Sequence, residues 1–216
     1  MKLACLTDLH GSHEALQRIL TDAGPVDTVL LGGDVTNFGS PDEAEALVRT
    51  AQQIGVPVWG VAGNCDSPQI ERRLEELGVS LRGRGVVQED VGLHGLPAMP
   101  PWRTGMYQFT EEELAAMLQA GYAQVADVKY HVVLSHAPPH RTQLDRTRLF
   151  QHVGSKALRQ FIDQTQPALV LCGHIHEARG VDRLGATVAV NCGAAVAGFY
   201  ALADLGPEVN VELRRA

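Results

Sequence analysis

Short runs of apolar residues alternate with amphipathic segments over the first third of the chain. The apolar runs at residues 3–6, 26–31 and 56–62 have the length and composition of buried strands. Between them, amphipathic segments begin near Ser12 and Ser40, each with apolar residues three and four positions apart. A strand–helix–strand order of this kind predicts parallel strands covered by helices.

The pattern changes in the middle of the chain. Shorter and more glycine-rich runs predict strands that pair antiparallel, followed by a loop over residues 97–109 that is rich in proline and aromatic residues. The segment from Thr110 to Glu113 is a capping box that opens a helix to about Ala120. Further strands are predicted at 86–87, 91–96, 131–134, 168–172, 187–190, 199–203 and 209–213, helices at 68–77 and 155–165, and a polar loop at 138–153. No repeat or linker interrupts this order, which predicts a single α/β domain over residues 1–216.

Composition narrows the class of function. The chain has 216 residues, of which 45% are hydrophobic and 20% charged, an ordinary balance for a globular protein. Its net charge of −7 disfavours a nucleic-acid polymer as partner, because such binding needs a basic surface. The start reaches Asp8 too soon for a signal peptide, and no apolar run has the ~20 residues of a membrane span. We therefore expect a cytoplasmic protein without a membrane partner.

The four cysteines form neither a C-x-x-C pair nor a disulfide framework. Cys5, Cys172 and Cys192 lie in apolar runs, where a reduced, buried thiol is expected. Cys65 differs, because it lies among polar residues.

Groups of polar residues follow several of the predicted strands directly. In open α/β sheets, such positions lie in the crevice beyond the carboxyl ends of the strands. Carboxylates, an amide oxygen and imidazoles in one crevice can bind divalent ions such as Mn²⁺, Fe²⁺ or Zn²⁺. The glycines that precede several of these residues permit sharp turns and a close approach of the backbone. The groups are Asp8-Leu9-His10, Gly33-Asp34, Gly63-Asn64-Cys65-Asp66, His136 and Gly173-His174-Ile175-His176.

The order D-x-H, G-D, G-N-x-D, a lone histidine and G-H-x-H resembles that of the calcineurin-like metallophosphoesterases. The resemblance runs from Asp8 to His176, and the G-N-C-D form is similar to that of small bacterial and archaeal members. It implies a layered fold of two mixed β-sheets flanked by helices. It also implies two divalent metal ions, such as Mn, Fe or Zn, and an activated bridging hydroxide that attacks a phosphate ester.

The resemblance assigns roles to individual residues. One metal ion would be held by Asp8, His10 and His176, and the other by Asn64, His136 and His174. Asp34 would bridge the two ions. The residues expected to act in catalysis are Asp34, Asn64, Cys65 and Asp66. For Asp66 the alternative is a structural role, in which Asp66 or Ser67 caps the helix that Pro68 begins.

Cys65 departs from the pattern, because many family members have a histidine at this position that approaches the leaving oxygen. A diester with a good leaving group tolerates a missing general acid better than a monoester does, so we expect a preference for diesters. Asn64, Cys65, His140 and Arg141 are the candidate substrate-binding residues, and Trp102 belongs to a loop that could form the rim. The turn Asn191-Cys192-Gly193 resembles a family turn near the metals but lacks its proline.

Two other functions compete with hydrolysis of a small phosphate ester. The first is a scaffold or binding protein on the same fold that has little or no catalytic activity. The second is a nuclease, which the acidic net charge disfavours. An exposed edge strand near the end of the chain would also allow a homodimer.

Overall fold

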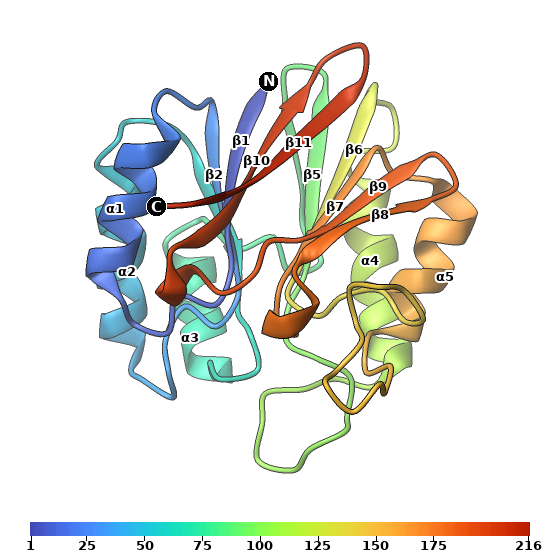
Figure 1. Cartoon of the computed structure of the whole chain (residues 1–216), viewed down its shortest axis with the longest axis horizontal. Coiled ribbons are helices and arrows are strands. Elements are labelled where there is room, and N and C mark those ends of the chain that lie inside the picture. Colours follow the sequence, from blue (N-terminus) through green and yellow to red (C-terminus); the bar gives the residue numbers. More distant parts are fainter.

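Two mixed β-sheets face each other in the computed structural model, which describes all residues from 1 to 216 (Figure 1). The five-stranded sheet has the order β11-β10-β1-β2-β3, in which β1, β2 and β3 are parallel. Strands β10 and β11 extend it antiparallel. Its strands are β1 Lys2–Leu6, β2 Thr28–Gly32, β3 Val58–Val61, β10 Phe199–Leu205 and β11 Val209–Arg215.

The six-stranded sheet has the order β4-β5-β6-β7-β9-β8. Its four central strands are parallel, and the two outer strands run antiparallel to their neighbours. Its strands are β4 Gly85–Gln88, β5 Val91–Leu96, β6 Tyr130–Ser135, β7 Leu169–Cys172, β8 Gly180–Leu184 and β9 Thr187–Asn191. The expected pair of mixed sheets is thus confirmed, as is the antiparallel pairing in the middle of the chain.

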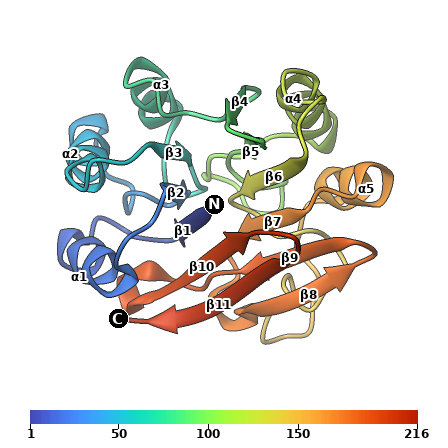
Figure 2. The ribbon, with the colours of Figure 1, turned by 90° about the horizontal axis from the view of Figure 1, so that it is seen from above.

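Helices cover the outer side of each sheet (Figure 2). Helices α1 (His13–Ala23), α2 (Pro41–Gln52) and α3 (Pro68–Glu76) lie along the five-stranded sheet. Helices α4 (Glu111–Ala123) and α5 (Lys156–Thr165) lie along the other sheet. Two single-turn 3₁₀ helices, η1 (His176–Ala178) and η2 (Ala195–Ala197), complete the elements. No helix is long and apolar enough to cross a membrane.

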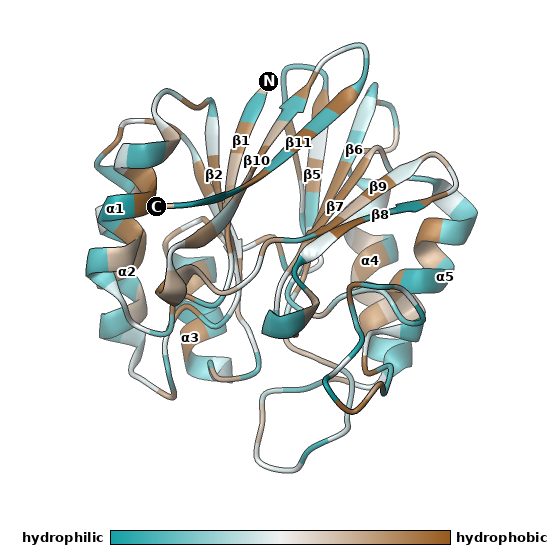
Figure 3. Ribbon diagram, viewed as in Figure 1, coloured by the Kyte–Doolittle hydropathy of each residue, from teal (hydrophilic) through white to brown (hydrophobic).

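Three apolar cores follow from this layering. One fills the space between the two sheets and includes Leu30 and Leu171. A second lies under α1, α2 and α3, and a third lies under α4 and α5. The helices are accordingly two-sided, with hydrophobic and hydrophilic strips along their length (Figure 3). Because both sheets are buried on both faces, their central strands read as nearly continuous apolar runs.

Hydroxyl side chains cap the five α-helices at their first turns, so polar residues set where each helix begins. Thr110 forms the complete capping box with Glu113 that the sequence predicted. At Ser40 the hydroxyl accepts the Glu43 N–H, the first half of such a box. Ser67 caps α3, so it is Ser67 and not Asp66 that caps the helix begun by Pro68. The caps are Ser12, Ser40, Ser67, Thr110 and Ser155.

A buried carboxyl group connects α3 to the end of β3. The Glu71 side chain accepts hydrogen bonds from the Ser80 hydroxyl at 2.6 Å and from the Ala62 N–H at 3.2 Å. Burial raises the pKa of Glu71 to about 7, although these two hydrogen bonds oppose the rise. The contact fixes Ala62, two residues before the Asn64 of the G-N-C-D motif.

We expect the Glu71 carboxyl to make stability depend on pH. Its pKa is higher in the folded than in the unfolded chain, so its contribution is fully present below about pH 4.5 and is lost as the pH rises through about 7. Urea unfolding of the wild type and of Glu71→Gln, measured between pH 4 and 8, isolates this contribution. The wild-type free energy of unfolding relative to the variant should fall by up to about 3 kcal/mol. A difference that does not change with pH would contradict the assignment.

Candidate metal centre

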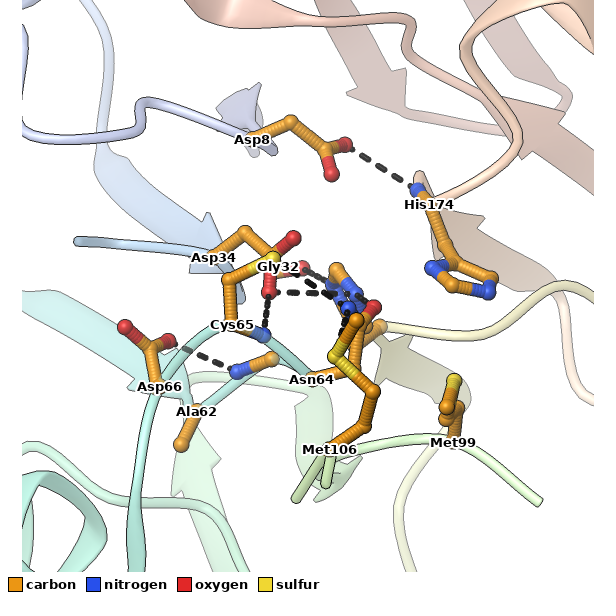
Figure 4. Close-up of polar contacts among 12 residues, drawn as sticks. Asp8, Gly32, Asp34, Ala62, Asn64, Cys65, Asp66, Met99, Met106 and His174 are labelled. Atoms are coloured by element: carbon orange, nitrogen blue, oxygen red, sulfur yellow. Dashed lines mark hydrogen bonds and ion pairs between the residues drawn. The ribbon is translucent and has the colours of Figure 1, made fainter. Parts of the chain in front are cut away.

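Polar residues from both sheets converge where the parallel strands end. Asp8 follows β1 and Asp34 follows β2, both in the five-stranded sheet. His136 follows β6 and His174 follows β7 in the six-stranded sheet. Because the carboxyl ends of β1, β2, β6 and β7 meet at one edge of the two facing sheets, residues distant in sequence become neighbours (Figure 4). This is the crevice that the sequence pattern predicted.

Asp8, His10 and His176 form the first group of side chains that could hold a metal ion. The Asp8 carboxylate is fully buried, and its Oδ1 lies 3.1 Å from His176 Nε2. Its Oδ2 accepts the backbone N–H of His174 at 3.0 Å. Burial opposes ionisation of Asp8, but the His176 imidazole and nearby positive charge hold its pKa at about 2. In return, Asp8 raises the pKa of His176.

His136 and Asn64 form the core of a second group. His136 Nδ1 lies 3.0 Å from the Gly32 carbonyl oxygen, which can only accept, so the ring proton is at Nδ1. The lone pair of Nε2 then faces Asn64 Oδ1 at 2.8 Å. Two acceptors that converge at this distance repel each other unless a cation lies against both. The donor atoms of this group therefore fit a divalent metal ion. The Nδ1–H of His136 is held by a backbone carbonyl, as the second ring nitrogen commonly is in metal-ligating histidines.

His174 lies beside this second group. Its ring centroid is 5.0 Å from that of His136, and its Nε2 is buried without a hydrogen-bond partner. Burial, followed by the neighbouring His136, lowers the pKa of His174 to about 3, so its imidazole is neutral. A neutral imidazole with an unpaired nitrogen is the form that binds metal ions.

Asp34 lies between the two groups. Its Oδ1 is 3.4 Å from His136 Nε2, and its Oδ2 is 3.9 Å from His10 Nε2. The backbone N–H of Cys65 donates to Oδ1 at 2.7 Å and fixes the orientation of the carboxylate. Asp34 is only 2% exposed, so its charge needs compensation within the site. A carboxylate that reaches both groups is in the position that a bridging ligand requires.

Cys65 borders the same cluster. Its sulfur lies among the potential ligand atoms of His10 and Asp34, and the Asn64 amide donates to it at 3.3 Å. Burial, followed by the negative charge of Asp34, raises the pKa of the Cys65 thiol well above its usual range. The structure therefore brings the cysteine of the G-N-C-D motif to the edge of the centre.

Left-handed backbone conformations orient four of the predicted ligands. Asp8, His10, Asp34 and His174 all have φ between +46° and +66°. This region is uncommon for residues other than glycine and is found at sites where the surrounding structure enforces it. Here the strand ends enforce it, because the backbone N–H groups of Asp8 and His10 donate to Gly33 and Asp34 carbonyls, each at 2.9 Å. No sequence pattern indicated this feature.

Asp66, which the motif places among the expected catalytic residues, holds two loops in position. Its two oxygens accept hydrogen bonds from the backbone of Val35, Thr36 and Gly63 and from the Thr36 hydroxyl. It belongs to neither group of ligands described above. Burial, followed by the charge of Asp34, raises the pKa of Asp66 to about 6. Its carboxylate thus ties the loop after β2 to the loop after β3.

The Asn191 side chain supports the G-H-x-H turn through hydrogen bonds to its backbone. Its buried amide donates to the carbonyl oxygens of Gly173 and Ile175, at 3.3 and 2.9 Å, and of Leu144. Its oxygen accepts the Gly193 N–H at 3.0 Å. The turn Asn191-Cys192-Gly193, which lacks the proline of the family turn that it resembles, therefore braces the G-H-x-H turn.

His140 and Arg141 line a hollow along α5 with Lys156 and Arg159. His140 faces Asp145, which is fully buried and accepts backbone N–H groups of the loop that contains both residues. The polar character of residues 138–153 thus reflects a loop built around Asp145.

The sequence did not single out Met106. Its sulfur lies 3.8 Å from the Asn64 amide nitrogen, and the next N–H, of Tyr107, donates to the Asn64 carbonyl at 3.1 Å. Met106 lies in a loop without a motif, and only the tertiary fold brings it to Asn64 (Figure 4).

Two positions beside the predicted ligands have room only for glycine, because a side chain there would enter the space that the ligands occupy. A Cβ at Gly63 would lie 2.2 Å from Asp34 Oδ1 and 2.1 Å from its backbone nitrogen. A Cβ at Gly173 would lie 2.3 Å from Asp8 Oδ2. Both contacts are too short for real atoms, so any larger side chain must displace a carboxylate of the centre.

We expect Gly63→Ala to weaken metal binding because it moves Asp34. Titration calorimetry with Mn²⁺ should show an affinity lower by about ten- to a hundredfold, the range found when the supports of metal ligands are changed. Gly180→Ala is the matched control, since a Cβ there meets nothing closer than 3.8 Å. Equal Mn²⁺ affinity in the two variants would show that Asp34 does not take part in metal binding.

Solved structures with the same fold include one that is named as a dimetal phosphatase. The structure of TT1561 from Thermus thermophilus superposes with a TM-score of 0.79 at 19% identity, covering 99% of this chain and 98% of that one. A dimetal phosphatase from Danio rerio gives a TM-score of 0.70 at 14% identity, covering 100% and 96%. At these identities the likeness establishes the fold alone.

Sequence comparison establishes the family. An uncharacterized protein from Methanocaldococcus jannaschii is 32% identical over 198 residues, which cover 88% of this chain and 87% of the relative. The family model for calcineurin-like phosphoesterases matches residues 1–178, the part that contains every predicted ligand. With the strand-end ligands gathered in one crevice of two mixed sheets, this chain belongs to the calcineurin-like phosphoesterase family.

Proposed function

We propose that this chain hydrolyses phosphate esters, with a preference for diesters, at a centre of two divalent metal ions. The position of Asp34 carries the proposal, because its two oxygens face the two groups of ligands. Membership of a metal-dependent phosphoesterase family supports the reaction class. The buried His174 Nε2, which has no hydrogen-bond partner, supports the presence of a cation.

The ligands divide as the motif order suggests. Asp8, His10 and His176 would hold one ion, and Asn64, His136 and His174 the other, with Asp34 shared. When bound, two such ions activate a water molecule and stabilise the negative oxygens of a phosphoryl group. Mixed oxygen and nitrogen ligands suit Mn²⁺, Fe²⁺ or Zn²⁺.

The protein holds the ligand side chains in position and excludes water from the floor of the site. Asp8, Asp34 and His136 are 2% exposed or less and form the floor of the site. The side chains of His10 and His176 are 18% and 44% exposed, so substrate would approach from their side. Buried polar groups held in place act more strongly on developing charge than they would in water. The hydrogen bonds from Cys65 N–H to Asp34 and from His136 to the Gly32 carbonyl preserve this arrangement.

The diester preference follows from the chemistry of Cys65. A thiol is a weaker hydrogen-bond donor than an imidazole, so it gives little help to a departing alkoxide. An ester with a good leaving group needs this help least. Asn64 would be the residue closest to both substrate and metal, since its amide lies between Cys65 and His136.

We expect metal-dependent turnover of bis-p-nitrophenyl phosphate that exceeds turnover of p-nitrophenyl phosphate. Chelator-treated protein restored with Mn²⁺ would be compared with Asp34→Ala and Asn64→Ala. Each variant should lose at least about a hundredfold in kcat/KM, because each removes a ligand of the centre.

Asp163→Ala and Asn210→Ala are the matched controls for these substitutions, since both residues lie on the surface away from the ligand groups. A higher kcat/KM for the monoester would refute the diester preference alone. If no divalent ion supports turnover of either ester, the scaffold function becomes the better description.

Metal binding should also stabilise the fold, whether or not catalysis occurs. At a Mn²⁺ concentration one hundred times the dissociation constant, the gain is about 2.7 kcal/mol, which a thermal or urea unfolding curve detects. Asp34→Ala should remove most of this gain, and Asp163→Ala should retain it. Equal stabilisation of all three proteins would indicate that the ion binds elsewhere.

A further inference from the structure

A hollow of about 560 Å³ opens directly beside the metal centre. Its size is within the range of small-molecule sites. Cys65 belongs both to its wall and to the ligand cluster with His10 and Asp34, so the two spaces share a border. Besides Cys65, its wall includes Phe38, Met106, Tyr107, Gln108 and Phe109.

The wall is apolar and aromatic. Phe38 is 61% exposed although it is a large hydrophobic residue, and the rings of Tyr107 and Phe109 meet edge to face at 5.0 Å between centroids. No lysine or arginine lines the hollow. Its single carboxylate, Asp66, is already engaged with protein donors. Such a wall suits a flat, uncharged group and does not suit a second phosphate.

The two sides of the hollow are attached to the G-N-C-D motif. The N–H of Phe38 donates to the Cys65 carbonyl at 2.9 Å, and Phe38 itself has φ of +55°. The N–H of Tyr107 donates to the Asn64 carbonyl at 3.1 Å. These bonds hold the aromatic rings at a fixed position relative to the predicted ligand Asn64.

We propose that this hollow selects the substrate by binding an aromatic ester group. The ring would pack against Phe38 and Met106. The proposal rests on the proposed function, because it places the phosphate at the metal centre while the aromatic group occupies the hollow. It narrows the substrate class to phosphate esters of aromatic or heteroaromatic groups.

Phosphonates test this without turnover, because their carbon–phosphorus bond replaces the ester bond that is cleaved. Titration calorimetry on the full, Mn²⁺-loaded chain would compare methylphosphonate with phenylphosphonate. We expect the phenyl compound to bind about tenfold tighter than the methyl compound.

Variants connect this difference to the hollow. Phe38→Ala should remove most of the preference for the phenyl compound. Phe150→Ala is the matched control, since Phe150 is 71% exposed and does not line the hollow. Trp102→Ala tests the competing surface, because the Trp102 ring lies 6.3 Å from that of His174.

Three results would overturn the proposal. The phenyl compound could bind no tighter than the methyl compound, or the preference could survive Phe38→Ala, or it could disappear in Trp102→Ala instead. If methylphosphonate binds only with Mn²⁺ present, the metal centre stands even where the hollow fails. If no phosphonate binds under any condition, the proposed function fails together with this inference.

Discussion

The gathering of buried acceptors in one space is the constraint on which the site depends. The carboxylates of Asp8 and Asp34, the Asn64 oxygen and the His136 Nε2 lone pair all point into one space at the sheet edges. Desolvated groups of this kind destabilise a fold unless something positive satisfies them. The other features of the edge follow from this need. Left-handed backbone at Asp8, His10, Asp34 and His174 costs about 1–3 kcal/mol each, and the three apolar cores hold the strands that enforce it.

Much of the fold was predictable because each layer of the structure has its own pattern of apolar and polar residues in the sequence. The parallel strands are buried on both faces and appear as apolar runs, and serine or threonine caps mark the helix starts. The ends of β3 differ from the prediction by one or two residues, since a strand ends where its pairing ends and not where hydrophobicity does. The order of the motifs likewise placed the ligands at the strand ends, because connections in parallel sheets bring those ends together.

The remainder of the site depends on contacts that no local pattern records. Asp66 stands in a family motif, yet its environment directs both oxygens to loop N–H groups. His140 and Arg141 looked suited to phosphate by residue type, but Asp145 organises their loop around itself. Phe38 and the segment that carries Met106 are held to the G-N-C-D motif by the backbone N–H groups of Phe38 and Tyr107, and such bonds are independent of side-chain identity and therefore invisible in the sequence. The type of a residue therefore indicates the role of its side chain only where the fold also fixes the position of that side chain.

The Asn64–Cys65 dipeptide joins the chemistry of the centre to the shape beside it. The Asn64 side chain faces His136, while its carbonyl holds the segment that carries Tyr107. The Cys65 N–H orients Asp34, while its carbonyl holds Phe38. A shift of either peptide would therefore move a metal ligand and a wall of the hollow together.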